Sequence, residues 1–286
     1  MKPFSHILFP LDFSARCTAA RPIVESWARR YNAKVTLFHT VQIPISSYGG
    51  PDGYPIVVDI PGIEAATKAR LDRFEIDVPA VTRVVSMGDP AFEIIEYAEE
   101  NGVDLIMMPT HGYGKFRSLL LGSTAAKVLH DSRCPVWTSA HIEQIPIEAR
   151  TEIHNVLCAI EIGAETVDLI RSASDLAQAW QAKLRLVHSV RVDEVRPERY
   201  LEGDLLHALI HKSQGEIAAF QRDAGTELEV TVDGGEEASH VIRDAALKYG
   251  ADLVVTGRGK LHETFGRLRT NTYAIIRESP CPVLSA

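Results

Sequence analysis

Two copies of one stretch of sequence decide the fold: AKVTLFHTV at residues 33–41 and AKLRLVHSV at residues 182–190. A second pair of landmarks repeats at nearly the same interval, since SRCPV at residues 132–136 returns as SPCPV at residues 279–283. The copies are roughly 148 residues apart in a chain of 286. Self-similarity at a fixed interval indicates that one structural unit is used twice. The chain is therefore predicted to be a tandem duplication.

Each copy alternates short apolar runs with segments of helical periodicity. In the first copy the predicted strands are 6–11, 35–41, 82–87, 104–108 and 135–139, and the predicted helices are 14–30, 63–74, 89–101 and one that Ser123 caps. Pro22 is expected to keep the early part of the first helical segment from forming a plain helix. This order predicts the α/β class, with two doubly wound domains that each have a five-stranded parallel sheet. The predicted domains are 1–145 and 146–286.

Composition and charge exclude several classes of partner. The chain has 45% hydrophobic and 24% charged residues, which is ordinary for a soluble globular protein, and a net charge of −8. The net charge argues against a nucleic-acid or anionic-membrane partner, because lysine and arginine clusters normally bind such surfaces. Residues 1–145 have 14 basic and 16 acidic side chains, whereas the rest has 16 and 22, so an anionic ligand suits the first half better. The N-terminus has no signal peptide and no segment reaches the length of a membrane helix, so a cytoplasmic protein is expected.

The cysteines and histidines give little indication of a metal site. The four cysteines occur singly, which argues against a zinc cage or a redox dithiol, and Cys134 and Cys281 are interpreted as small core residues. His207 and His211 are four residues apart, so on a helix they share a face that Asp204 extends. Surface histidine pairs at this spacing are common, and a metal role is the less favoured interpretation.

Candidate ligand-binding residues follow two of the predicted strands. Asp12 ends the first strand, where a carboxylate could hold a divalent ion on a polyphosphate or accept a hydrogen bond from a ribose or base. The alternative is that Asp12 caps the next helix. Gly88 follows the third strand and suits either close backbone approach to a ligand or a plain turn before Pro90.

A glycine-framed loop follows the fourth strand. Gly112 and Gly122 enclose nine residues that include Lys115 and Arg117, and Ser123 comes next. Glycine lets backbone N–H groups approach an anion, and the start of a helix adds about half a positive charge. On spacing alone, a turn at Gly112 and a simple helix cap explain the pattern equally well.

Taken together, PLDFS at residues 10–14, MPTHG at 108–112, GS at 122–123 and CPV at 134–136 resemble the universal stress protein family. The resemblance covers essentially the whole chain as two domains. It implies the adenine nucleotide alpha hydrolase-like fold, an intramolecular pseudo-dimer paired through the last strands, and ATP or AMP as ligand, often with a divalent ion such as magnesium. The family pattern is glycine, two residues, glycine, nine residues, glycine, then serine or threonine.

Transferred to this chain, the resemblance assigns residues to the two ends of the nucleotide. The adenosine side is Pro10, Leu11, Asp12 and Val41, and the phosphate side is Met108, His111, Gly112, Gly122, Ser123 and Thr124. Asp12 would reach magnesium through the nucleotide. Pro109 stands where the pattern has its first glycine, and proline lacks the N–H that could contact the ligand.

The second copy departs further from the pattern. Glu161 matches Asp12, Arg269 matches Gly122, and the stretch from Gly257 to Arg269 is one residue shorter than the pattern requires. The side chain of Arg269 would occupy the space in which a phosphate approaches the backbone, so the second site is predicted to have lost its nucleotide. The alternative is that Arg258, Lys260 and Arg269 converge on an anion in a new way.

Three functions of different classes fit these observations. The favoured one is a nucleotide-binding stress or signalling protein, with an unidentified protein partner and homodimer formation left open. The second is a nucleotide-free interaction scaffold whose two sites are vestigial and whose recognition surface is the loop at 42–62. The third is an enzyme acting on adenylates, for which the residues support at most slow ATP hydrolysis.

Overall fold

The computed structural model of the chain describes residues 4–42, 59–110, 121–140, 142, 151–191, 202–258 and 267–286. These residues form two compact units. The first contains the described residues up to Val136 except Leu121, and the second contains Leu121 and the residues from Trp137 onward. The predicted domain boundary at 145–146 lies outside the described residues. Pairing of the two halves through their last strands stays a prediction.

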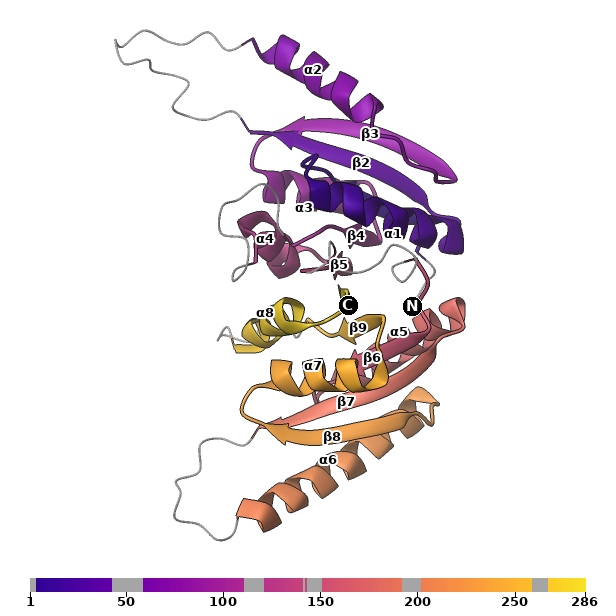
Figure 1. Ribbon diagram of the computed structural model, residues 1–286, viewed down its shortest axis with the longest axis vertical. Helices are drawn as coiled ribbons and strands as arrows, with labels where there is room; N and C mark the ends of the chain where they lie inside the picture. Colours follow the sequence, from indigo (N-terminus) through magenta and orange to yellow (C-terminus); the bar gives the residue numbers. More distant parts are fainter. Residues whose placement is uncertain are drawn as a thin grey trace, which may run out of the picture. The chain divides into compact units, whose positions relative to one another are not determined.

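The first half of the chain alternates strands and helices around a parallel sheet (Figure 1). The elements are β1 (His6–Pro10), α1 (Ala15–Tyr31), β2 (Lys34–Val41), α2 (Ile60–Asp72), β3 (Ala80–Met87), α3 (Pro90–Glu100), β4 (Leu105–Met107), α4 (Ser123–Asp131) and β5 (Val136–Thr138). The strand order is β3-β2-β1-β4-β5. β1 pairs in parallel with β2 and β4, and β2 pairs in parallel with β3.

The core of this half lies along its central strands. Every residue of β1 and of β4 is buried, including Ile7, Phe9 and Ile106, whose side chains are completely inaccessible. Successive residues of a strand point to opposite faces, so burial at consecutive positions means that both faces of the sheet are covered. This confirms the doubly wound arrangement that the uninterrupted apolar runs predict.

The second half repeats the same order of elements. They are β6 (Asn155–Ala159), α5 (Thr166–Trp180), β7 (Lys183–Arg191), α6 (Glu202–Ala224), β8 (Glu229–Gly235), α7 (Ala238–Tyr249), β9 (Leu253–Thr256), α8 (Arg267–Glu278) and β10 (Val283–Ser285). Its strand order, β10-β9-β6-β7-β8, matches β5-β4-β1-β2-β3. The pairings are again parallel. None of the helices in the described ranges combines the length and apolarity needed to cross a membrane.

The repeated stretch at 33–41 and 182–190 has a local structural reason. The helix before each copy ends at a residue in the left-handed conformation, Asn32 with φ 51° and Gln181 with φ 55°. The N–H of the next residue, Ala33 or Ala182, donates to the carbonyl oxygen five residues earlier at 2.8 Å. This bond closes the helix end and turns the chain into β2 or β7.

A repeated set of hydrogen bonds joins β1 to β4 in the first half and β6 to β9 in the second. The Asp104 carboxylate accepts from the backbone N–H groups of Ser5 at 2.8 Å and His6 at 3.0 Å. Asp252 accepts in the same way from His154 at 2.8 Å and from the residue after it at 2.9 Å. Each aspartate precedes β4 or β9, so it fixes that strand beside β1 or β6.

Pro22 does not interrupt the first helix, and the expectation that it would is wrong. α1 runs unbroken from Ala15 to Tyr31 with Pro22 inside it. Proline removes the N–H that would bond the carbonyl of Thr18. Thr18 is exposed, so water can take that place, while Ile23 and Trp27 remain buried. Tertiary burial here outweighs the local cost of proline.

The helix α2 begins earlier than predicted. It starts at Ile60 instead of residue 63, because the Asp59 carboxylate accepts from the Gly62 N–H at 3.0 Å and caps the helix, with Pro61 in its first turn. Most of the loop predicted at 42–62, residues 43–58, lies outside the described residues.

Candidate functional site

Asp12 lies just beyond β1, in the turn that leads into α1. Its Oδ1 accepts from the backbone N–H of Ser14 at 2.9 Å and from the thiol of Cys17 at 3.0 Å. The N-cap of α1 is Ser14, whose hydroxyl oxygen accepts from the Cys17 N–H at 3.3 Å, so the alternative that Asp12 is the cap is wrong. Both bonds of the carboxylate use Oδ1 and leave Oδ2 outside them.

The residue after Asp12 is held in an unusual conformation. Phe13 has φ 59°, in the left-handed region that costs a bulky residue free energy. Its ring centroid is 4.8 Å from that of His39, and the Arg70 guanidinium carbon is 4.1 Å from it. His39 Nδ1 lies 2.6 Å from the Leu11 carbonyl oxygen. Sequence reasoning missed this cluster, because Arg70 comes from α2, far along the chain.

Val41 and Gly88 meet where β2 and β3 end. The Gly88 N–H donates to the Val41 carbonyl oxygen at 3.2 Å. Gly88 has φ 153°, and a Cβ added to it would lie 2.5 Å from Glu93 Oε1. Asp89 then caps α3 by accepting from the N–H groups of Ala91 and Phe92, both at 3.1 Å. The turn alternative therefore accounts for this glycine by itself.

The end of β4 leads into the glycine-framed loop. Met108, Pro109 and Thr110 are all buried. The Gly122 N–H donates to the Thr110 carbonyl oxygen at 2.8 Å, which closes the base of the loop. His111 and Gly112, both predicted to face the phosphates, lie outside the described residues.

The start of α4 differs from the prediction at one residue. The N-cap is Gly122, with φ −58° and ψ 142°, and Ser123 is the first residue of the helix, so the prediction that Ser123 is the cap is wrong. The hydroxyl of a first helical residue is not needed to cap, and Ser123 is exposed while Thr124 is half-buried. The N–H groups of the first turn have no acceptor inside the helix. Glycine at the cap leaves these groups approachable.

The topology brings Asp12, Val41 and Met108 to one edge of the sheet. Parallel strands β2, β1 and β4 are neighbours, so their carboxyl ends lie together. The chain moves outward from β1 to β2 and β3, then crosses back to place β4 on the other side of β1. Ligands of doubly wound folds bind beyond the carboxyl ends of the strands, at the point where the strand order reverses. Here that point lies between Asp12 and the end of β4.

The second half uses the matching residues differently. Glu161, which corresponds to Asp12, accepts through Oε1 from the side-chain amide of Asn271 on α8 at 3.2 Å. Asn271 is two residues after Arg269, as Thr124 is two residues after Gly122. The carboxylate at the end of β6 is therefore joined to the helix that would hold the phosphates. The side chains of Lys260 and Arg269 lie outside the described part of the chain, so the predicted convergence with Arg258 stays a prediction.

The cysteines and the histidine pair of the sequence analysis lie at separate places in the fold. All four cysteines are free thiols, with Cys281 buried and Cys134 half-buried, and burial raises the pKa of Cys281 to about 12. Within the described ranges no group of three metal-ligating side chains occurs. His207 and His211 are exposed on α6.

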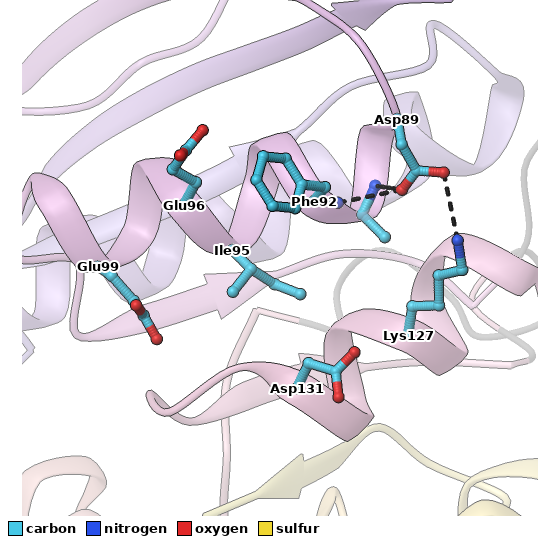
Figure 2. Close-up of a pocket in the computed structure, with 8 residues that line it drawn as sticks. Asp89, Phe92, Ile95, Glu96, Glu99, Lys127 and Asp131 are labelled. Atoms are coloured by element: carbon cyan, nitrogen blue, oxygen red, sulfur yellow. Dashed lines mark hydrogen bonds and ion pairs between the residues drawn. The ribbon is translucent and has the colours of Figure 1, made fainter.

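A shallow groove of about 440 Å³ lies between α3 and α4 (Figure 2). Phe92 and Ile95 form its apolar part, and Phe92 is 60% exposed. Three of its charged groups have partners in the protein: Asp89 accepts from the Lys127 ammonium group at 3.2 Å, and Glu99 pairs with Arg133 at 3.3 Å. The pKa of Asp89 is lowered, chiefly by the hydrogen bond from the Phe92 N–H.

The repeated order of strands and helices makes the chain a tandem pair of doubly wound α/β domains. The chain belongs to the Universal stress protein family, whose sequence profile matches residues 3–139 and again residues 152–285. A universal stress protein encoded in the QAH/OAS sulfhydrylase 3' region of Thermus aquaticus is 31% identical over 142 residues, which are 46% of this chain and 96% of that protein. Universal stress protein A homolog 2 of Coxiella burnetii is 34% identical over 122 residues, 41% of this chain and 82% of the relative.

Solved structures share the tandem fold over the whole chain. A universal stress protein from Archaeoglobus fulgidus has a TM-score of 0.64 at 19% identity and covers 98% of this chain and 97% of its own. The protein PA1789 from Pseudomonas aeruginosa, described as functionally unknown, has a TM-score of 0.64 at 15% identity, with 99% and 92% coverage. At these identities the likeness concerns the fold.

Proposed function

We propose that the first domain binds an adenine nucleotide, ATP or AMP, and acts in a stress response or signalling instead of metabolism. The observation that carries the proposal is the start of α4. The Gly122 N–H is bonded to Thr110, whereas the N–H groups of Ser123 and Thr124 have no acceptor within the helix. A helix N-terminus without a side chain at its cap suits a phosphate group, because the helix dipole and the N–H groups both favour negative charge.

The adenosine side of the proposed site lies at the ends of β1 and β2. It comprises Pro10, Leu11, Asp12 and Val41: Pro10 pairs with Phe38, the Leu11 N–H donates to the Phe38 carbonyl oxygen at 2.7 Å, and Val41 is the last residue of β2. Oδ2 of Asp12 can accept a hydrogen bond from a ribose hydroxyl or an exocyclic amine. On the phosphate side the proposal includes Met108, His111 and Gly112 by family resemblance, with Pro109 at the first glycine of the pattern. Gly88 is included because a glycine at the end of β3 permits close backbone approach to a ligand.

Magnesium, in this proposal, arrives with the nucleotide. In the alternative in which Asp12 Oδ2 ligates this ion instead of contacting the ribose or base, Asp12 supplies one ligand, and the described residues contain no group of three metal-ligating side chains. Magnesium is usually held by one or two carboxylates together with substrate phosphates and water. A single carboxylate beside a polyphosphate fits that pattern and does not form an all-protein metal site.

Binding is proposed, with slow ATP hydrolysis as the most that the site would support. Asp12 is already hydrogen-bonded to Ser14 and Cys17, which suits a fixed hydrogen-bond acceptor. The second domain is proposed to bind no nucleotide, because Glu161 is engaged by Asn271. A cytoplasmic location, a protein partner and homodimer formation belong to the same proposal.

The test is calorimetric titration of the nucleotide-stripped protein with ATP and magnesium, and separately with AMP. Micromolar binding at one site per chain is expected, with a large loss in Asp12→Ala and no change in the matched variant Glu161→Ala. Binding that survives Asp12→Ala, or that is lost in Glu161→Ala, would place the ligand elsewhere.

A nucleotide-free interaction scaffold is the second candidate. Pro109 favours it, because the first glycine of the family pattern and its N–H are absent. Affinity weaker than millimolar for both nucleotides, in a protein whose unfolding is cooperative, would support the scaffold over the nucleotide-binding function.

A further inference from the structure

The thiol of Cys17 makes a direct contact with the carboxylate that is proposed to meet the nucleotide. Cys17 is the third residue of α1, and its Sγ lies 3.0 Å from Asp12 Oδ1. The other acceptor near this sulfur, the Pro10 carbonyl oxygen, is at 3.9 Å. Asp12 Oδ1 also accepts from the Ser14 N–H at 2.9 Å, so two donors that follow Asp12 in the chain fix one oxygen.

The surroundings of Cys17 keep it a hydrogen-bond donor. Its side chain is 3% exposed, and burial together with the nearby Asp12 charge raises the pKa of the thiol to about 12. A thiol that is inaccessible to solvent reacts poorly with oxidants or alkylating agents. The features that make Cys17 unsuited to redox chemistry make it suited to hold a carboxylate.

The second half of the chain provides an internal comparison. Position 17 corresponds to Thr166, whose hydroxyl donates to the backbone carbonyl oxygen of Glu161 at 2.6 Å. The Glu161 carboxylate receives no such support from its own turn and instead accepts from Asn271 on α8. In the first half, which is predicted to bind nucleotide, the Asp12 carboxylate is held within its own turn. In the second half, which is predicted to bind none, the Glu161 carboxylate is bonded to α8.

We propose that Cys17 is a positioning residue, whose thiol fixes the Asp12 carboxylate so that its other oxygen faces the adenosine part of the ligand. The inference rests on the proposed nucleotide-binding function. Cys17 does not contact the ligand in this proposal and acts only through Asp12. Its contribution must therefore disappear when Asp12 is absent.

A double-mutant cycle on ATP binding tests that dependence. Cys17→Ala is expected to weaken binding about two- to tenfold, which is the range for one modest hydrogen bond, and Cys17→Ser is expected to restore most of the loss. In the Asp12→Ala background, Cys17→Ala should change the affinity no further. Cys158→Ala, which removes a buried thiol in the second domain, is the matched control and should leave the affinity unchanged.

A measurement without ligand separates the two proposals. The S–H stretching band of Cys17, assigned by its absence in Cys17→Ser, should shift in Asp12→Ala because the hydrogen bond is lost. If the wild-type protein binds neither ATP nor AMP, the proposed function fails, and the positioning role fails with it even if the band shifts. If the protein binds and the Cys17→Ala effect is the same with and without Asp12, or the band does not move, the positioning role alone is overturned.

Discussion

Gly122→Arg imposes on the first domain the residue that the second domain carries at the matching position, Arg269. The backbone at Gly122 has φ −58° and ψ 142°, a region open to every L-residue, so the substitution introduces no backbone strain. The N–H of residue 122 keeps its bond to the Thr110 carbonyl. The free energy of unfolding is therefore expected to stay within about 1 kcal/mol of the wild-type value and to rise slightly, because the unfolded chain loses freedom.

Ligand binding is expected to respond quite differently. The arginine side chain would extend over the N–H groups of Ser123 and Thr124, which are the proposed phosphate donors. Two hydrogen bonds to a charged group contribute about 1.5 kcal/mol each at the low end, or about 3 kcal/mol together. The loss corresponds to more than about a hundredfold in Kd.

The assay pairs calorimetric titration with ATP and urea unfolding followed by circular dichroism. Gly215→Arg is the control, because it makes the same change of charge at an exposed helical glycine where an added Cβ meets nothing within 4 Å. It should bind ATP as the wild type does. Undiminished or tighter binding by Gly122→Arg would refute the reasoning, since a guanidinium group would then replace the backbone N–H groups as the phosphate contact.

Three further predictions concern stability. Trp27→Ala should lower the free energy of unfolding by about 3–5 kcal/mol in urea titrations, because Trp27 is 1% exposed and its loss leaves a cavity; a smaller change would mean that the core collapses around it. Burial, and then the Lys34 charge, lower the pKa of His6 from 6.5. The unfolded state therefore binds more protons just below pH 6.5, so stability is full above that pH and falls as the pH decreases, and a His6→Gln profile that stays as steep would contradict this. Gly88→Ala should cost about 1–3 kcal/mol because φ is 153° there, whereas Gly215→Ala should be neutral or stabilising; equal effects would exclude backbone strain.

The sequence predicts those features that depend on local pattern. The repeated stretches reveal two α/β units, and the apolar runs place the strands to within a residue or two of the observed bounds. Asp12 and Met108 follow strands that are predicted to be parallel, so their presence at one edge follows from the topology alone. Two local predictions are wrong. At Pro22, tertiary burial keeps the helix unbroken, and at α4 the cap is Gly122 instead of the adjacent Ser123.

Contacts between residues far apart in sequence could not be predicted in the same way. Arg70 lies over Phe13, Asp104 binds the backbone at His6, and Asn271 binds Glu161, over separations of 57 to 110 residues. Periodicity gives the face of an element on which a side chain lies, but it does not give the partner that packing places opposite that side chain. Even the short-range bond from Cys17 to Asp12 depends on Ser14, not Asp12, being the helix cap.

The duplication, the edge of the sheet where the strands end and the residues available there all follow from residue spacing and periodicity. Spacing and periodicity determine such features, because they reflect the geometry of single strands and helices. Three other features required the folded packing: Oδ1 is the fixed oxygen of Asp12, Gly122 caps α4, and Glu161 is bonded to Asn271 on α8. These outcomes depend on distances of about 3 Å between groups that only the folded packing brings together, since a hydrogen bond weakens steeply beyond that range.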